Sequence, residues 1–301
     1  MNIEEVSYLG WKRCLKLGNR HVEVVATLDV GPRVVHFGRP GGENLFHVLP
    51  AQAGRTGGKA WRLYGGHRLW YAPEPLLPAP DNDPVEWRAE AGGARILQPP
   101  EKGSGVRKEI FLRLSDSRPT VEAVHTLRHL GRKALRVAPW GITVLKAGGT
   151  AVLPLPRRRP FPKFVNPDSS LALWPYTDFG DPRWKWETEY LLCRSRAAQT
   201  RAQKVGALVP DGWLAYARAG SLFVLQFPRP GAGPYPDHGC NAEIFSQKDV
   251  LELESLGPLG ELKPGGSLSH TERWHLGKAP GARLSAGDIA RRAAGLISGG
   301  V

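Results

Sequence analysis

Cysteine and methionine are scarce in this chain of 301 residues, which contains three cysteines and one methionine. Cys14, Cys193 and Cys240 lie far apart and form no Cys-x-x-Cys or Cys/His spacing. The odd number and the spacing argue against a disulfide framework and a structural zinc site. The oxygen-rich run Asp81-Asn82-Asp83-Pro84 lacks the glycine-spaced carboxylates of a calcium loop and is interpreted as an Asx turn. We predict buried free thiols and no metal ion.

Long apolar runs are also missing, since no stretch reaches the roughly 18 residues that a membrane-spanning helix needs. The start, Met1-Asn2-Ile3-Glu4-Glu5, is acidic, whereas a signal peptide opens with basic and then apolar residues. We therefore expect a soluble protein with a cytoplasmic location and no membrane partner.

Acidic residues are fewer than basic ones, 28 against 41, and the formal net charge is +13. Nucleic-acid binding requires clustered Lys and Arg, yet only Arg157–Arg159 and Arg291–Arg292 form runs of note. GxSxG, P-loop, HExxH and strand-borne GxGxxG motifs are absent as well, which excludes the enzyme classes that depend on them. We expect no nucleic-acid partner and no cofactor.

Strand-forming patterns dominate what the chain does contain. Hydrophobic residues make up 41% of it and include 10 Trp, 9 Phe and 7 Tyr, enough for a packed core. Around fifteen short segments alternate apolar and polar residues between Gly, Pro, Asn or Asp, which is typical of β-strands. That number exceeds a small immunoglobulin-like sandwich. We predict a single all-β domain over residues 1–301, built as a large double-sheet sandwich.

Few segments favour a helix. The pattern predicts a terminal helix over about residues 285–297, because Ser285 can cap it and Asp288 falls in its first turn. A further short helical piece is expected near residues 183–189. The Pro- and Arg-rich run 155–162 is interpreted as an extended connector between the two halves of the sandwich.

One run, Tyr64-Gly65-Gly66-His67-Arg68-Leu69-Trp70-Tyr71-Ala72-Pro73-Glu74, combines titratable, aromatic and backbone-permissive residues in a loop-like stretch. Its glycines allow φ > 0 or close approach to a ligand, His67 can titrate near neutral pH, and Trp70 offers a flat face. A carbohydrate uses all of these, because its C–H faces lie on aromatic rings while its hydroxyls need groups such as Arg68 and Glu74. The alternative is a surface turn whose aromatics seal the core.

Two further stretches carry a family resemblance. The first contains Ala138-Pro139-Trp140-Gly141-Ile142-Thr143 and then Gly148-Gly149-Thr150; the second joins the glutamate-bearing run 251–258 to Leu262-Lys263-Pro264-Gly265 and a closing strand. With Lys204-Val205-Gly206 and the run 235–243, the chain from about Arg33 to Trp274 resembles an uncharacterised domain family of the galactose mutarotase-like superfamily. The resemblance implies a β-supersandwich with a carbohydrate site in the concave face of one sheet.

The same resemblance implies an isomerase similar to the aldose 1-epimerases. Epimerisation needs a base for the anomeric hydroxyl proton and an acid for the ring oxygen. The base of the epimerases is a C-terminal glutamate, and the comparable strand here carries Glu254 and Glu252, which share one face. The central histidine motif of the epimerases is missing from the region around His129, so the acid role is assigned to His67.

Other residues are assigned to substrate binding. Arg33 matches a place where superfamily members keep an arginine near sugar hydroxyls, and Asp237, His238 and Glu243 form a second polar cluster after Pro236. The complete substrate-binding set is Arg33, Arg68, Trp70, Glu74, Asp237, His238 and Glu243. We expect a small-molecule carbohydrate as the partner. We also expect His67, Arg33, Glu243 and Glu252 or Glu254 to converge in one pocket.

Two alternatives stay open at this point. A glycoside hydrolase or polysaccharide lyase would need two carboxylates across a cleft, for which Glu74 and Glu254 are the pair to inspect. A non-catalytic sugar-binding or structural protein would place the Trp and His clusters in separate, buried positions. The sequence leaves open whether the protein is an enzyme.

Overall fold

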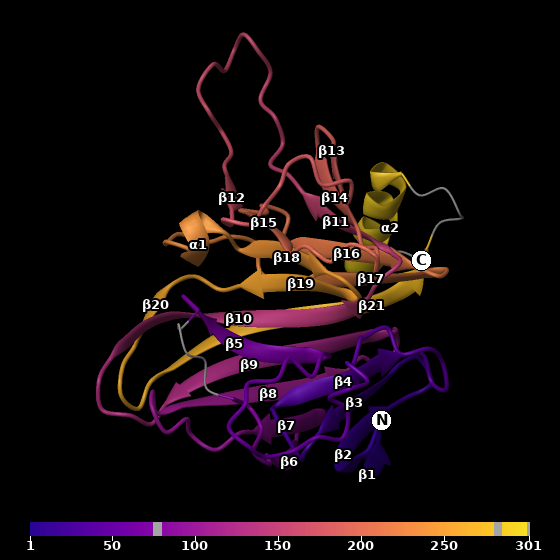
Figure 1. Cartoon of the computed structure of the whole chain (residues 1–301), viewed down its shortest axis with the longest axis vertical. Helices are drawn as coiled ribbons and strands as arrows, with labels where there is room; N and C mark the ends of the chain where they lie inside the picture. The colour runs from indigo at the N-terminus through magenta and orange to yellow at the C-terminus, as the bar shows by residue number, and fades with distance from the viewer. Residues whose placement is uncertain (75–79, 280–284, 300–301) are drawn as a thin grey trace.

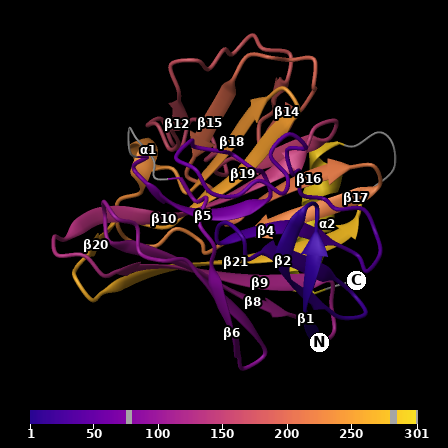
Figure 2. The ribbon, with the colours of Figure 1, turned by 60° about the horizontal axis from the view of Figure 1, so that its bottom comes forward.

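The computed structural model describes residues 1–74, 80–279 and 285–299. Two antiparallel sheets lie against each other, and each takes strands from both halves of the chain (Figure 1 and Figure 2). The first sheet has the strand order β1-β2-β3-β4-β5-β10-β19-β18-β15-β12, with β20 also paired to β10. The second has the order β13-β14-β11-β16-β17-β21-β9-β8-β7-β6.

The first sheet is composed of β1 (Asn2–Tyr8), β2 (Trp11–Gly18), β3 (Glu23–Thr27), β4 (Arg33–Gly38), β5 (His67–Ala72), β10 (Leu135–Lys146), β12 (Leu171–Leu173), β15 (Gln203–Ala207), β18 (Ala242–Gln247), β19 (Val250–Leu256) and β20 (Gly260–Leu262). The second is composed of β6 (Glu86–Glu90), β7 (Gly93–Leu97), β8 (Val106–Leu114), β9 (Thr120–His129), β11 (Thr150–Pro154), β13 (Trp184–Trp186), β14 (Tyr190–Arg194), β16 (Trp213–Arg218), β17 (Ser221–Gln226) and β21 (Ser267–Lys278). The described helices are α1 (Pro236–Gly239) and α2 (Ala286–Ser298).

Strand β10 lies at the centre of the first sheet, between β5 and β19. Every residue from Val137 to Leu145 is buried, which agrees with the nearly continuous apolar sequence of this strand. Both faces of β10 are therefore covered, one by the second sheet and the other by side chains described below.

The core fills the space between the two sheets. Phe37 of β4 and Phe46, which bridges to Leu145 of β10, contribute rings from the side of the first sheet. Each packs edge to face on Phe223 of β17 and Trp274 of β21, with ring centroids 5.4 to 5.9 Å apart. Such edge-to-face contacts stabilise aromatic cores beyond the area that they bury. The residues on the opposite face of the first sheet are thus turned away from the second sheet.

Helix α2 covers the outer surface of the second sheet. The Ser285 hydroxyl accepts a hydrogen bond from the Asp288 N–H at the first turn, and Gly299 ends the helix in a left-handed conformation. Ile289 and Ala293 pack on Val224 and its neighbours in β16 and β17, where Figure 1 shows the helix. Neither described helix has the length and apolarity that a bilayer crossing requires.

The predicted all-β sandwich with a C-terminal helix is confirmed, and the three cysteines are buried and free. The helical piece expected near 183–189 is wrong, because Trp184–Trp186 forms β13 and pairs with β14. Residues 155–170 contain no regular element and extend away from the sandwich (Figure 1). That the domain is single stays a prediction.

The run from Tyr64 to Glu74 is a strand rather than a loop over most of its length, since His67–Ala72 forms β5. Gly65 and Gly66 have φ values of +90° and +72°. A Cβ on Gly66 would lie 2.3 Å from the carbonyl oxygen of Val34. The glycines therefore let the chain pass close to neighbouring backbone before it enters the centre of the sheet.

Candidate functional site

A row of charged residues crosses the first sheet. Arg33 of β4 pairs with Arg68 of β5, Arg68 with Ile142 of β10, Ile142 with Glu254 of β19, and Glu254 with Glu243 of β18. Residues that pair directly across strands point to the same face. We call this the polar face; it is turned away from the second sheet, because alternate residues such as Leu69, Leu253 and Ile244 lie in the core.

Aromatic rings border the charged row. Trp70 and Trp140 are directly paired on β5 and β10, two residues from Arg68 and Ile142, and therefore lie on the polar face. The Arg68 guanidinium lies 5.1 Å from the Trp70 ring and 5.5 Å from that of Trp61. On the far side, Trp174 and the half-exposed Tyr176 approach the same group of charges. Flat aromatic surfaces beside charged groups suit a polar ligand with apolar faces.

Lys204 of β15 holds the carboxylates at one end of the row. Its Nζ lies 2.7 Å from Glu243 Oε2 and 2.9 Å from Glu254 Oε2, and Glu254 also accepts a hydrogen bond of 2.9 Å from Trp140 Nε1. The ammonium lies 4.8 Å from the Trp140 ring and 4.7 Å from that of Trp174. Burial opposes the charge of Lys204, but the two carboxylates outweigh it and raise its pKa.

The protonation of Glu243 balances the charge of the cluster formed by Lys204, Glu243 and Glu254. Burial raises the pKa of Glu243 well above its usual value, although the Lys204 ammonium opposes the shift. One ammonium cannot neutralise two ionised carboxylates, so a proton held by Glu243 gives the charge-balanced state.

Glu252 differs from the other two glutamates. It stands two residues before Glu254 on β19, on the same face, and its side chain makes no hydrogen bond or ion pair with the described residues. Burial, together with the nearby Glu254, raises the pKa of Glu252 to about 7, whereas Arg68 opposes the shift. A carboxyl group that titrates near neutral pH, 8% exposed beside a charged surface, has the properties of a proton-transfer group.

Three predicted residues lie at the margins. Glu74 is exposed just beyond the end of β5, and it is close enough to raise the pKa of Glu252 slightly. Asp237 and His238 have φ values of 50° and 60° in α1 and line a small cavity of about 210 Å³ with Trp174.

A separate cavity of about 630 Å³, lined by Gly31, Asp81 and Glu101 among others, includes none of the predicted site residues.

His67 does not join the polar face. It pairs with Thr143 of β10, one residue out of step with Arg68, and points between the two sheets, where it is 0% exposed. The expected convergence of His67 with Arg33, Glu243 and Glu252 or Glu254 is therefore not observed, because successive residues of a strand point to opposite faces. Burial, and next the neighbouring His125, lower the pKa of His67 well below its usual value.

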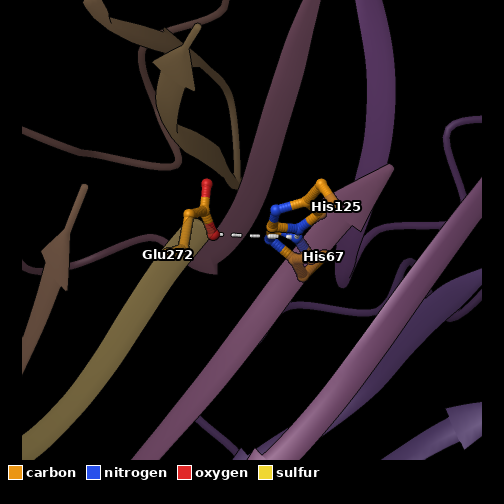
Figure 3. A group of neighbouring side chains, drawn as sticks. All are labelled: His67, His125 and Glu272. Carbon is orange, nitrogen blue, oxygen red and sulfur yellow. Dashed lines mark hydrogen bonds and ion pairs between the residues drawn. The ribbon is translucent and has the colours of Figure 1, made fainter. Parts of the chain in front are cut away.

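Within the core, His67 belongs to a hydrogen-bonded network with His125 and Glu272 (Figure 3). His67 Nε2 lies 2.6 Å from His125 Nε2 and 3.8 Å from Glu272 Oε2. The outer nitrogens are also satisfied: His67 Nδ1 bonds the Thr143 hydroxyl and His125 Nδ1 bonds the carbonyl oxygen of His270. Every ring nitrogen of the pair has a partner.

Two imidazoles and a carboxylate are also a ligand set for zinc, and their ligand atoms all lie within 4.8 Å of one another. Two nitrogens bound to one tetrahedral zinc ion would be about 3.3 Å apart, given bonds of about 2.0 Å. The observed 2.6 Å between the His67 and His125 Nε2 atoms is that of a direct hydrogen bond. Glu272 is in turn held by Trp274 Nε1 at 2.7 Å and by the Ser255 hydroxyl at 2.6 Å. The geometry thus fits a satisfied polar network better than a metal centre.

Comparison with solved structures gives the fold a name. A galactose mutarotase-related enzyme from Lactobacillus acidophilus is 10% identical, with a TM-score of 0.57 over 90% of this chain and 100% of that one. A galactose mutarotase-like protein from Clostridium acetobutylicum is also 10% identical, with a TM-score of 0.58 over 92% of this chain and 98% of that one. The chain has the galactose mutarotase-like fold.

A third similar structure is a TPR-domain containing protein from Parabacteroides distasonis, 14% identical with a TM-score of 0.59. The match covers 91% of this chain and 50% of that one, so this chain spans about half the length of that protein. No family model and no curated protein matches the sequence.

Proposed function

We propose that the protein binds a carbohydrate on the polar face and interconverts its anomers, as an aldose 1-epimerase-like isomerase. The observation that carries this proposal is Glu252, a carboxyl group with a pKa of about 7 on the same sheet face as Arg68 and the Trp70 and Trp140 rings. The fold that the chain shares with galactose mutarotase-like proteins supports it.

The contacts on the polar face suggest a role for each residue in sugar binding. The exposed Trp61 ring, 5.5 Å from the Arg68 guanidinium, receives the C–H face of a sugar, and Arg33 and Arg68 donate to its oxygens. Lys204, held by Glu243 and Glu254, contributes a fixed positive charge beside the ring. In this arrangement Glu254 organises Lys204 and Trp140, and it is fully buried.

Glu252 is the proton-transfer group of this proposal. As the ring C–O bond breaks, its carboxylate accepts the anomeric hydroxyl proton while the ring oxygen takes a proton from solvent. Ring closure on the other face of the carbonyl reverses both transfers, so no net proton is consumed. The glycoside hydrolase alternative gains no support. It needs two carboxylates that face each other across a cleft, whereas Glu74 is exposed and Glu254 is fully buried.

Polarimetry of freshly dissolved sugars tests the proposal. Wild-type protein should accelerate mutarotation of at least one member of a panel of D-glucose, D-galactose, D-glucuronate and D-glucose 6-phosphate. Glu252→Gln should lose about 100-fold or more of that acceleration, the usual size of a general acid-base contribution. Glu261→Gln, which alters an exposed carboxylate on β20, is the control and should retain it. No acceleration of any of the four sugars by wild-type protein would refute the isomerase assignment.

A further inference from the structure

The two arginines of the polar face lie side by side. Arg33 and Arg68 are direct cross-strand neighbours on β4 and β5, and their side chains are 1% and 6% exposed. Two guanidinium groups, which stay charged in proteins, therefore sit together at the surface of a sheet while almost removed from water.

Their hydrogen-bonding capacity is largely unused. Arg33 Nη1 donates to the carbonyl oxygen of Gly65 at 2.7 Å. Arg33 Nε, and Nε and Nη1 of Arg68, are buried without a partner among the described residues. In the part of the chain that the structure describes, no carboxylate oxygen lies within 4.0 Å of either guanidinium. The buried carboxylates of this region are paired with lysines instead: Asp81 and Glu101 with Lys108, and Glu243 and Glu254 with Lys204.

The surroundings hold the guanidiniums in place without satisfying them. Arg68 lies between the rings of Trp61 and Trp70, and Arg33 lies 5.3 Å from the Tyr64 ring. Aromatic faces attract a cation but accept no strong hydrogen bonds. Burial and the charge of Arg68 lower the pKa of Arg33 to about 9, although Asp81 and Glu252 act in the opposite direction. Leaving buried charged donors unpaired is costly, so a site of this kind favours an anionic ligand.

We infer that Arg33 and Arg68 bind an anionic group carried by the carbohydrate, either the carboxylate of a uronic acid or a phosphate ester. The inference rests on the proposed function and specifies the class of its substrate. Guanidinium forks match carboxylate and phosphate oxygens in pairs, and such charge-assisted bonds are about twice as strong as neutral ones.

The spacing along the sheet agrees with one sugar bridging both ends. Arg68 and Glu252 lie on β5 and β19, which are separated by β10. Two strand spacings amount to roughly 9.5 Å. Glu252 also lies two residues, about 7 Å, beyond Glu254, which is in register with Arg68 through Ile142. A monosaccharide together with the Arg68 and Glu252 side chains spans the resulting distance of roughly 12 Å, whereas Trp70 and Trp140 lie on the other side of Arg68.

Isothermal titration calorimetry with four sugars tests the inference. D-Glucuronate or D-glucose 6-phosphate, or both, should bind at least about tenfold more tightly than D-glucose and D-galactose, which corresponds to about 1.4 kcal/mol. The two anionic arms distinguish a carboxylate from a phosphate. Arg68→Gln should reduce the anionic sugars to the affinity of their neutral counterparts, and Arg273→Gln, an exposed arginine on the second sheet, is the matched control.

A second variant separates a loss of anion binding from a loss of folding. Arg68→Lys keeps the charge but loses the fork, and it should lose most of the anionic preference with an unchanged thermal unfolding midpoint. Equal affinity for neutral and anionic sugars, or a preference that survives in both Arg68 variants, would overturn the inference while leaving carbohydrate binding intact. Failure of all four sugars to bind would instead overturn the proposed function together with it.

Discussion

His67 and Arg68 are adjacent in the sequence, yet their side chains serve opposite sides of the first sheet. His67 contacts His125 and Thr143 in the core, whereas Arg68 lies between Trp61 and Trp70 on the polar face. Because β5 runs through the middle of the sheet, this single strand contributes both to the buried network and to the candidate binding surface.

Replacement of His67 should affect stability and spare ligand binding. His67→Gln removes the bond to His125 and disturbs that to Thr143, so we expect a loss of about 2 kcal/mol or more in the free energy of unfolding. Urea titration measures this loss, and the sugar affinity of the folded variant should match wild type. His21→Gln, at a partly exposed position, is the control. Retained stability with abolished mutarotation would reinstate His67 as a catalytic acid.

The pH dependence of mutarotation should follow Glu252. Its pKa of about 7 means that the carboxylate, the form that accepts a proton, becomes populated as the pH rises through neutrality. The rate should therefore increase between about pH 6 and pH 8 with a midpoint near 7, and Glu261→Gln should keep the same profile. A pH-independent rate in this range would be incompatible with Glu252 as the base.

Glu252 should also make stability depend on pH. Its folded pKa of about 7 exceeds the ordinary 4.5, so the folded protein holds this proton more tightly than the unfolded chain does. The stabilisation is complete below about pH 4.5 and is lost as the pH rises to 7. Glu252→Gln should thus gain up to about 3 kcal/mol relative to wild type at pH 8, compared with pH 4. An identical difference at both pH values would contradict the assigned pKa.

Loss of Lys204 should leave the buried Glu254 carboxylate without a cation. Lys204→Met is expected to lower the free energy of unfolding by about 3 to 5 kcal/mol, the usual cost of removing one partner of a buried ion pair. The double variant Lys204→Met with Glu254→Gln should recover part of that loss, because the unpaired buried charge is gone. Chemical denaturation of wild type, the two single variants and the double variant measures the coupling, and additive effects of the two substitutions would speak against a shared charge cluster.

Gly141 should tolerate no side chain. A Cβ at this position would lie 2.1 Å from Glu272 Oε1, inside the buried network. Gly141→Ala should cost about 1 to 3 kcal/mol, as expected for an added methyl group in a packed interior. Gly103→Ala is the matched control, since a Cβ there meets nothing within 4 Å. Equal unfolding midpoints for the two variants would contradict this prediction, because they would mean that the Glu272 side chain moves aside at little cost.

Much of the fold could be predicted because strand alternation and helix capping are local signals. The terminal helix was located within a residue or two from Ser285 and Asp288, and the sandwich from its many short strands. Strand β5 is not predictable from the sequence, because Gly65, Gly66 and Pro73 surround it with turn-forming residues. Their role is to let the chain approach Val34 and neighbouring backbone, which only the tertiary structure shows.

The candidate site was predictable only in part. Alternation along β19 correctly placed Glu252 and Glu254 on one face, because that relationship lies within one strand. Alternation within β5 also separates His67 from Arg68, but this could be used only once β5 was known to be a strand. Lys204 was not assigned to the site, although a lysine in the otherwise buried strand Gln203–Ala207 was a usable signal. Its two carboxylate partners come from β18, which pairs with β15, and from β19, which pairs with β18, and both pairings are long-range contacts.

A carbohydrate bound on the polar face should present its anomeric carbon to Glu252. A crystal structure of the complex with the tightest-binding sugar of the panel tests this pose. The sugar should lie between Arg68 and Glu252, with the anomeric hydroxyl within hydrogen-bonding distance of the Glu252 carboxyl. A sugar bound instead in the cavity beside Asp81 and Glu101, or in the hollow beside His238, would contradict it.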